Sequence, residues 1–371
     1  MKELLYKMHY ILTSKKTEYN ATIFIRTLAI SLISVFIPIF ILDKSGPFLI
    51  IPYLLSTALL YPLALLLAYV AQKRFSVIVT LFLSLMFYVL GIYSLQLLTV
   101  LSVVGAAFFF KSAELIFWLP LHVEFTKVVA HEKTKSFAIV IAITTLTPFL
   151  GPLVGAFIID LFGYSSLFIA SLAIYLSMVL PQSLLHLKKE ELNINKVSFS
   201  LVPAYIVEGI QNLSLTVVWP AFLFYSLWTR DSIGLLFSTI SLVGGVASII
   251  VSKFIPKDRI AKLFKPTFIS HSLSSLMRVS TTKLMAFGGG ALGFLSYSFF
   301  KPRFMSMFYH KVAHRRSEVI KRELNIALGM AIVALTFTAI SLLYNYTVAF
   351  MATIFLASLA SLYMGTLFKK L

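Results

Sequence analysis

Five charged residues lie inside long apolar stretches of the sequence, where charge is rarely found: Arg26, Lys111, Glu114, Glu208 and Lys301. A charge at the depth of a lipid bilayer is costly, and it persists where it faces a partner or a water-filled cavity. These residue types can pair with one another, attract a charged solute or carry a proton. We therefore predict that the five side chains face a cavity in which a small molecule binds.

The spacing of these charges allows several ion pairs. Lys111 and Glu114 are three residues apart, which places them on one face of a helix. At 1.5 Å per residue, Arg26 and Glu208 each lie about 6 Å inside their apolar stretches. Arg26 can bridge to Glu114, or to Glu208 as a gate that breaks when the cavity opens. Alternatively, Arg26 and Lys111 extend to the membrane surface and Glu114 only neutralises Lys111.

The balance of these charges, three cations against two carboxylates, favours an anionic solute. Lys111 and Lys301 facing one cavity would attract a molecule that bears a carboxylate. Glu114 and Glu208 are the only acids predicted to lie deep inside the apolar stretches. A buried carboxylate can exchange a proton near neutral pH, so these two residues are our candidates for proton coupling.

Polar residues near Glu208 add hydrogen-bonding capacity. Gln211 is about one helical turn from Glu208, and Asn212 follows it, so both can contact the same solute. Trp118 and Trp219 offer stacking surfaces, although tryptophan also anchors helices at membrane interfaces. No pattern indicates a metal site, a cofactor or a catalytic centre, so we predict that the protein is not an enzyme and binds neither metal nor cofactor.

The composition places these residues in a membrane protein. Of 371 residues, 59% are hydrophobic and only 12% are charged, and the mean hydropathy is +0.92. Soluble domains contain about 25% charged residues, so a water-soluble globular protein is excluded. The sequence has no cysteine, which excludes disulfides, thiolate metal sites and thiol chemistry.

Twelve stretches of the sequence are long and apolar enough to cross a membrane, which takes about 20 residues as a helix. The ninth is the weakest, because it contains His271 and Arg278. The predicted spans lie near residues 22–42, 47–70, 76–94, 97–120, 137–159, 165–186, 201–226, 232–255, 264–281, 284–308, 324–344 and 346–367. We therefore expect an all-α polytopic membrane protein.

The positive charges predict how these spans are oriented. The chain has 32 Lys and Arg, 14 Asp and Glu, and a net charge of +18. With twelve spans, and with Lys301 counted among the cations around the end of the tenth span, 26 of the 32 cations fall on the side that carries both termini and four fall on the other side. The remaining two, Arg26 and Lys111, lie inside spans. Positive residues collect in cytoplasmic loops, so we predict cytoplasmic termini and a plasma-membrane location. The charge is then an orientation signal that also attracts anionic lipid, and we expect no nucleic-acid partner.

The spans divide into two sets of six. A polar stretch near residues 186–200 separates them, and the sequence Phe109-Phe110-Lys111 recurs 190 residues later as Phe-Phe-Lys ending at Lys301. Parallel repeats related by an axis along the membrane normal occur in one large class of transporters. We predict an N-terminal six-helix bundle over 1–187, a cytoplasmic linker over 188–200 and a C-terminal six-helix bundle over 201–371.

The fifth predicted span carries the most specific motif, a Gly-Pro-x-x-Gly-Gly pattern with alanine in place of the last glycine, at Gly151, Pro152 and Gly155. The loop after the eighth span keeps Asp258 and Arg259, whereas the loop after the second span has neither Asp nor Gly. With this motif and its two sets of six spans, the sequence resembles the major facilitator superfamily.

That resemblance implies two pseudo-symmetric bundles that rock about a central site and expose it to one side of the membrane and then to the other. In that fold the first, fourth, seventh and tenth helices line the cavity, and these are the predicted helices that carry the five charges. The resemblance implies proton-coupled transport of a small organic solute, amphipathic or anionic, and the fifth-span motif favours export. The expected partners are the solute, membrane lipid, and protons or another ion, and we expect a monomer.

Two other functions remain open from the sequence. A lipid flippase on the same fold would have a lateral opening lined by apolar residues. A sensor or scaffold that does not transport would have a blocked cavity and an enlarged soluble tail. The altered loop after the second span keeps this last alternative open.

Overall fold

A computed structural model describes residues 15–131, 143–144, 146–184, 201–226, 228–254, 257–314 and 317–367. Every regular element among these residues is a helix. This agrees with the all-α prediction. In a bilayer, a long apolar segment can satisfy its backbone hydrogen bonds only as a helix or within a closed barrel.

The described helices before residue 185 form the N-terminal half, and those after residue 200 form the C-terminal half. The N-terminal half contains α2 (Lys15–Ile33), α3 (Phe36–Ser45), the turn η1 (Pro47–Leu49), α4 (Ile50–Leu59), α5 (Tyr61–Arg74), α6 (Val77–Gln96), α7 (Val100–His131), the turn η2 (Thr147–Phe149), α9 (Leu150–Ser177) and α10 (Val179–Leu184). The C-terminal half contains α11 (Pro203–Leu213), the π-helical segment η4 (Ser214–Val218), α12 (Trp219–Tyr225), α13 (Arg230–Phe254), α14 (Lys257–Arg278), α15 (Lys283–His314), α16 (Glu318–Leu343) and α17 (Tyr346–Leu367).

These helices account for the twelve predicted spans. Eight described segments are long and apolar enough to cross a membrane, and the pair α4 and α5, bent by 47°, makes a ninth. The longest of the eight, Thr147–Ser183, comprises the predicted fifth and sixth spans, because Gly163 interrupts α9 with a φ of 81° that favours glycine. The remaining two spans are α14 and α15, whose polar residues lower their hydropathy.

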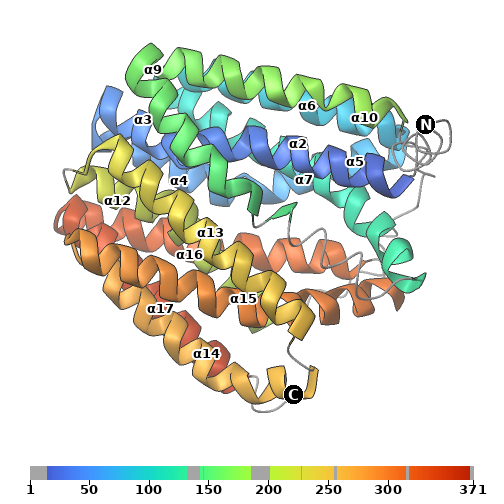
Figure 1. Ribbon diagram of the computed structural model, residues 1–371. Helices are drawn as coiled ribbons and strands as arrows, with labels where there is room; N and C mark the ends of the chain where they lie inside the picture. The colour runs from blue at the N-terminus through green and yellow to red at the C-terminus, as the bar shows by residue number, and fades with distance from the viewer. Residues whose placement is uncertain are drawn as a thin grey trace, which may run out of the picture.

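The helices gather into two bundles, drawn from blue to green and from yellow to red in Figure 1. In the N-terminal half, α2 packs on α9 and α6 packs on α7. In the C-terminal half, α11 packs on α16, and α14 packs on α15 and α17. Helix α2 begins and helix α17 ends at one end of the molecule, opposite α3 and α12 (Figure 1). We call these the terminal end and the distal end. The predicted linker at 188–200 lies outside the described residues, so the domain bounds stay a prediction.

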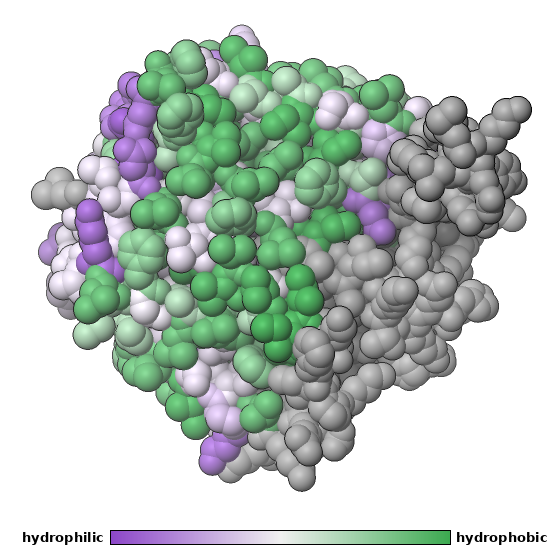
Figure 2. Space-filling model, in the orientation of Figure 1, coloured by the Kyte–Doolittle hydropathy of each residue, from purple (hydrophilic) through white to green (hydrophobic). Residues whose placement is uncertain are grey.

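The outer surface is apolar enough to face lipid. Figure 2 shows hydrophobic residues over most of the described part of the visible face, with hydrophilic residues gathered toward the distal edge. Exposed large side chains include Met86, Leu342 and Leu101, of which Leu101 is 81% exposed. An apolar surface of this extent is not found on soluble monomers, which agrees with a polytopic membrane protein.

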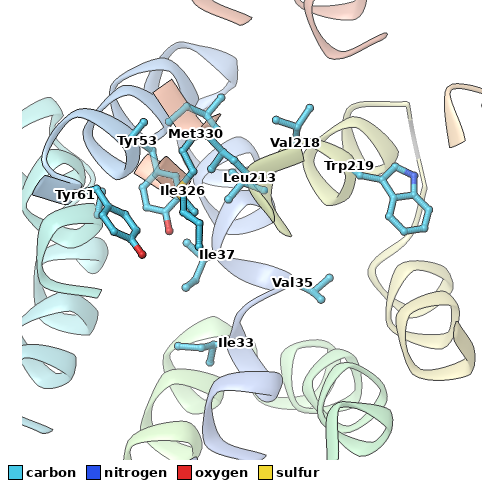
Figure 3. Packing of buried hydrophobic residues seen from close by; sticks show 14 of the residues in the cluster. Ile33, Val35, Ile37, Tyr53, Tyr61, Leu213, Val218, Trp219, Ile326 and Met330 are labelled. Atoms are coloured by element: carbon cyan, nitrogen blue, oxygen red, sulfur yellow. The ribbon is translucent and has the colours of Figure 1, made fainter. Parts of the chain in front are cut away.

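Buried apolar side chains join the halves near the distal end. Ile33, Val35 and Ile37 of the first span belong to the same buried apolar cluster as Leu213 and Val218 of the seventh (Figure 3). The helices α3 and α12 are in contact, and α3 also touches η4. The π-helical turn of η4 ends just before Pro220, which has no backbone N–H to continue the hydrogen-bond ladder. Such turns are frequent at functional sites.

Candidate functional site

Three cavities, of about 320, 290 and 210 Å³, are all lined by Asn212. The largest, the central cavity, lies between α5 and α7 of one half and α11, α15 and α16 of the other. The second, the C-terminal cavity, lies among α11, α14, α15 and α17, and the third, the N-terminal cavity, is walled mainly by α2, α4 and α7. Their charged lining residues are Arg26, Lys111, Glu114, Glu208, Arg278, Lys301, Arg322 and Glu323. Five cations face three carboxylates, which gives the cavity walls a net charge of +2.

The carboxylate of Glu208 is held by two cations of the C-terminal half. Lys301 Nζ on α15 lies 2.6 Å from Glu208 Oε1. Arg322 on α16 donates to both oxygens, from Nη2 to Oε1 at 2.6 Å and from Nε to Oε2 at 3.1 Å. This two-pronged geometry is the strong form of an arginine–carboxylate contact. Glu208 therefore occupies the two cations that would otherwise be available to an anionic solute.

Glu323 links this cluster to the N-terminal half. Its Oε1 accepts from Arg322 Nη1 at 2.7 Å, and its Oε2 accepts from the Tyr61 hydroxyl at 2.5 Å. Arg322 and Glu323 are buried, at 7% and 6% exposure. A continuous chain of hydrogen bonds thus runs from Tyr61 through Glu323 and Arg322 to Glu208.

Lys111 and Glu114 pair with each other on α7, with Nζ 2.7 Å from Oε2. Lys111 also lies 5.8 Å from the centre of the Tyr61 ring. The pair is the contact that the i, i+3 spacing permits, and it matches the alternative in which Glu114 neutralises Lys111. The side chain of Glu114 is 40% exposed, within a wall shared by the central and N-terminal cavities.

Arg26 forms neither of its two predicted ion pairs in this structure. Its guanidinium lies over two aromatic rings of α7, 4.4 Å from the centre of Phe117 and 5.3 Å from that of Trp118. Nor does Arg26 extend to a surface, because it is only 6% exposed. The reason is that Glu114 and Glu208 already have cationic partners. Arg26 thus remains a buried cation without a carboxylate partner among the described residues.

Arg322 and Glu323 are site residues that the sequence prediction missed. The predicted eleventh span begins at residue 324, which leaves Arg322 and Glu323 outside it, with Arg322 among the cations counted on the side of the termini. The prediction that Glu114 and Glu208 are the only deep acids was therefore wrong. The helix α16 begins at Glu318, before its apolar stretch, and Arg322 and Glu323 on its next turn are buried. An Arg-Glu pair directly before an apolar run is the signal that could have revealed them.

The two polar candidates next to Glu208 have different surroundings. Gln211 is 9% exposed and donates to the Ala357 carbonyl at 2.5 Å and to the Ser361 hydroxyl at 2.6 Å, while its oxygen lies 3.2 Å from His271 Nε2. It therefore ties α11 to α14 and α17 at the wall of the C-terminal cavity. Asn212 is exposed and lines all three cavities, so its amide is available to a solute.

The fifth-span motif lies where helices pack closely. A Cβ at Gly151 would overlap Ser31, and one at Gly155 would lie 2.6 Å from the Leu32 carbonyl oxygen. The motif therefore lets α9 pack tightly on α2. The loop-motif residues Asp258 and Arg259 fall in the first turn of α14, and their side chains lie outside the described part of the structure.

Polar contacts join the halves on both sides of the central cavity. At the distal end, Arg230 on α13 lies 2.9 Å from Asp43 Oδ2 and donates from Nε to the Tyr164 hydroxyl at 3.0 Å. We call these three residues the distal latch. Toward the terminal end, His122 Nδ1 of α7 and the Tyr309 hydroxyl of α15 are 2.8 Å apart. His122 and Tyr309 also line the central cavity.

Solved transporter structures share the arrangement of the helices in this chain. The human organic anion transporter MFSD10 superposes with a TM-score of 0.63 at 12% identity, covering 95% of this chain and 98% of that one. A bacterial homologue of the iron transporter ferroportin in its outward-facing state gives 0.66 at 16% identity, covering 96% and 99%. The nucleoside transporter NupG gives 0.67 at 11% identity, also covering 96% and 99%. This chain has the major facilitator fold.

The major facilitator fold confirms the architecture expected from the sequence. No protein-family model and no curated protein matches the sequence. At 11–16% identity the similarity shows the fold alone, so the functional argument must come from the residues of this chain. All five charges predicted to face a cavity do line the three cavities that meet at Asn212.

Proposed function

We propose that this chain is a secondary transporter that moves a small organic anion across a membrane by alternating access. One observation carries the proposal: cavities between and within the halves are lined by five cations and three carboxylates. A positive cavity with low-dielectric walls concentrates anions. The solute class rests on these charges and not on the fold, which transporters of different solutes share.

Glu208 provides a means of coupling to protons. Its carboxylate holds Lys301 and Arg322, so an anionic solute must compete with it for these cations. A proton on Glu208 would release Lys301 and the Nε and Nη2 groups of Arg322, and a bound anion would in turn favour protonation of Glu208. Proton and anion therefore favour each other's binding, and we propose that they cross together. This differs from the export that the fifth-span motif favours, and the direction of flux distinguishes the two.

Alternating access requires contacts that break on one side of the cavity while those on the other side persist. The distal latch and the His122–Tyr309 contact are suited to these roles, because each joins one half to the other. We propose that the terminal end is cytoplasmic, as the distribution of Lys and Arg predicts. We also propose that the protein works as a monomer in the plasma membrane.

The test is solute flux into proteoliposomes containing the full chain, with an imposed proton gradient and an internal pH dye. Radiolabelled p-aminohippurate serves as the organic anion and tetraethylammonium as the cationic control. We expect p-aminohippurate to accumulate on the alkaline side with acidification there, and tetraethylammonium to stay out. Glu208→Gln should still carry the anion, without proton movement. Lys283→Met removes an exposed cation at the distal end and should behave as the unchanged chain does.

Three outcomes would contradict this proposal in different ways. Movement of p-aminohippurate against the direction of the protons would establish exchange and support export. Proton-coupled flux that persists in Glu208→Gln would remove Glu208 from the coupling role. No flux of any organic anion tested would overturn anion transport and favour the lipid flippase or the sensor.

A further inference from the structure

Arg278 is a fully buried arginine without a hydrogen-bond partner among the described residues. It is the last residue of α14, its relative exposure is 0%, and the described part of the chain offers no acceptor to any of its three guanidinium nitrogens. Its guanidinium lies over the ring of Trp219, with Cζ 4.6 Å from the ring centre. Arg322, another buried arginine of this half, instead holds two carboxylates.

An arginine keeps its positive charge in proteins, and a buried charge normally has a counter-ion. Among the described residues, no carboxylate forms an ion pair with Arg278. Stacking on Trp219 offsets only part of the cost of burial and leaves every N–H unused. The guanidinium therefore lacks an acceptor that carries negative charge.

Ser274 and Gly293 lie beside the guanidinium of Arg278. Ser274, one turn earlier on α14, also has a buried hydroxyl, which has no hydrogen-bond partner among the described residues. A Cβ at Gly293 of α15 would overlap Arg278 Nη2 and lie 2.5 Å from Ser274 Oγ. Glycine at this position thus lets both unpaired donor groups lie directly against the backbone of α15.

Arg278 and Gly293 line the C-terminal cavity of about 290 Å³. Much of the rest of its wall is aromatic, from Phe268, Phe294, Tyr297, Phe300 and Phe304. A single halide ion would fill only a small part of this volume and would leave the aromatic rings without a contact. A charged head and an apolar body match the wall more fully.

We propose that Arg278, supported by Ser274, binds the carboxylate of an amphipathic organic anion whose apolar body lies among the aromatic rings of the C-terminal cavity. This rests on the proposed function and specifies its substrate class. The cavity also reaches Lys301 and Arg322, which connects the site to the proton-coupling cluster.

Trp219 supplies the readout, because it underlies Arg278 and is one of only three tryptophans. The full chain carrying Trp118→Phe and Trp228→Phe would be placed in lipid nanodiscs, so that Trp219 is its only tryptophan. The fluorescence of Trp219 would then be measured while benzoate, benzamide or chloride is added. We expect saturable changes with benzoate only. In this background, Arg278→Met and Gly293→Ala should weaken benzoate binding about 10- to 100-fold. Lys283→Met, which removes a cation outside the cavity, should leave the affinity unchanged.

Thermal unfolding of each variant serves as the control for correct folding. Arg278→Met should unfold no lower than its parent, because it replaces an unpaired buried charge by an apolar side chain of similar length. If it does not fold, Gly293→Ala tests the site with the charge retained. Unchanged benzoate affinity in Gly293→Ala and in folded Arg278→Met would overturn the proposal. So would equal binding of benzamide, and a response to chloride alone would show an inorganic anion site instead.

This experiment measures binding and can fail independently of transport. If p-aminohippurate is transported but the affinity for benzoate does not change in the Arg278 variant, the transporter proposal stands and this site does not. If benzoate binding depends on Arg278 but no organic anion is transported, the site stands and the transporter proposal fails.

Discussion

The hydroxyl of Tyr61 lies 2.5 Å from Oε2 of Glu323, although 262 positions separate the two residues in the sequence. The contact joins α5 of the N-terminal half to α16 of the C-terminal half. The same carboxylate accepts from Arg322, which also holds Glu208. A movement of α5 relative to α16 therefore acts directly on the charges that we expect to hold the solute.

Tyr61→Phe removes this link and keeps the ring. A hydrogen bond to a charged group contributes about 1.5–3 kcal/mol, so the variant should unfold at lower temperature in nanodiscs. Tyr93→Phe is the matched control, because Tyr93 is 65% exposed, and it should leave the unfolding midpoint unchanged. Equal midpoints for the Tyr61 variant and the parent would show that the contact does not stabilise this conformation.

Arg322→Met should be among the most destabilising single changes in the cavity. It leaves both Glu208 and Glu323 without their shared arginine, and breaking a buried ion pair costs about 3–5 kcal/mol. Denaturant unfolding should show this loss, while Lys321→Met, which removes a looser contact of 3.9 Å to Glu318, should cost less than about 1 kcal/mol. Adding Glu323→Gln to Arg322→Met should recover part of the stability. No recovery would argue against electrostatic coupling between the two.

Arg230→Ala should loosen the distal end. The Arg230–Asp43 contact is partly exposed, and such pairs contribute about 1 kcal/mol, which corresponds to about a fivefold change in the open population. The chain has no cysteine, so Ile37→Cys provides a single reactive site behind the latch. We expect a membrane-impermeant maleimide to label it about five times faster in Arg230→Ala. An unchanged rate would show that apolar packing alone closes this end.

Gly155→Ala should destabilise the packing of α9 on α2. The added Cβ would lie 2.6 Å from the Leu32 carbonyl oxygen and 2.7 Å from the Phe36 ring, and overpacking of this kind costs about 1–3 kcal/mol. Gly105→Ala adds the same atom where the nearest neighbour is 3.7 Å away, so it should be tolerated. Thermal unfolding of the two variants gives the comparison. Equal midpoints would mean that α9 and α2 can move apart at little cost.

The helical architecture was predictable because the length of an apolar run and the placement of Lys and Arg are properties of the sequence itself. Even α14, which is too polar for hydropathy to identify as a span, was predicted in place. The polar residues that weakened that prediction are buried: His271 bonds Gln211, and Arg278 stacks on Trp219. Inside a bundle these residues are shielded from lipid by neighbouring helices, so hydropathy underestimates such a span.

The partners within the site were less predictable, because pairing depends on how each helix is rotated about its axis. Lys301 was expected at the same cavity as Glu208, and the two are in contact. Arg26 was expected to find a carboxylate, but it faces Phe117. Arg322 fell outside the predicted eleventh span, because hydropathy marks where the apolar residues begin and not where the helix begins.

Asn212 faces all three cavities, and two of them lead to arginines that have no carboxylate partner: Arg26 in the N-terminal cavity and Arg278 in the C-terminal cavity. Each of these two cavities therefore holds one such arginine, and the small amide of Asn212 lies in the wall of both. A molecule with two negative ends would have to pass position 212 to contact both arginines, so the size of the residue there would limit which of these molecules fit.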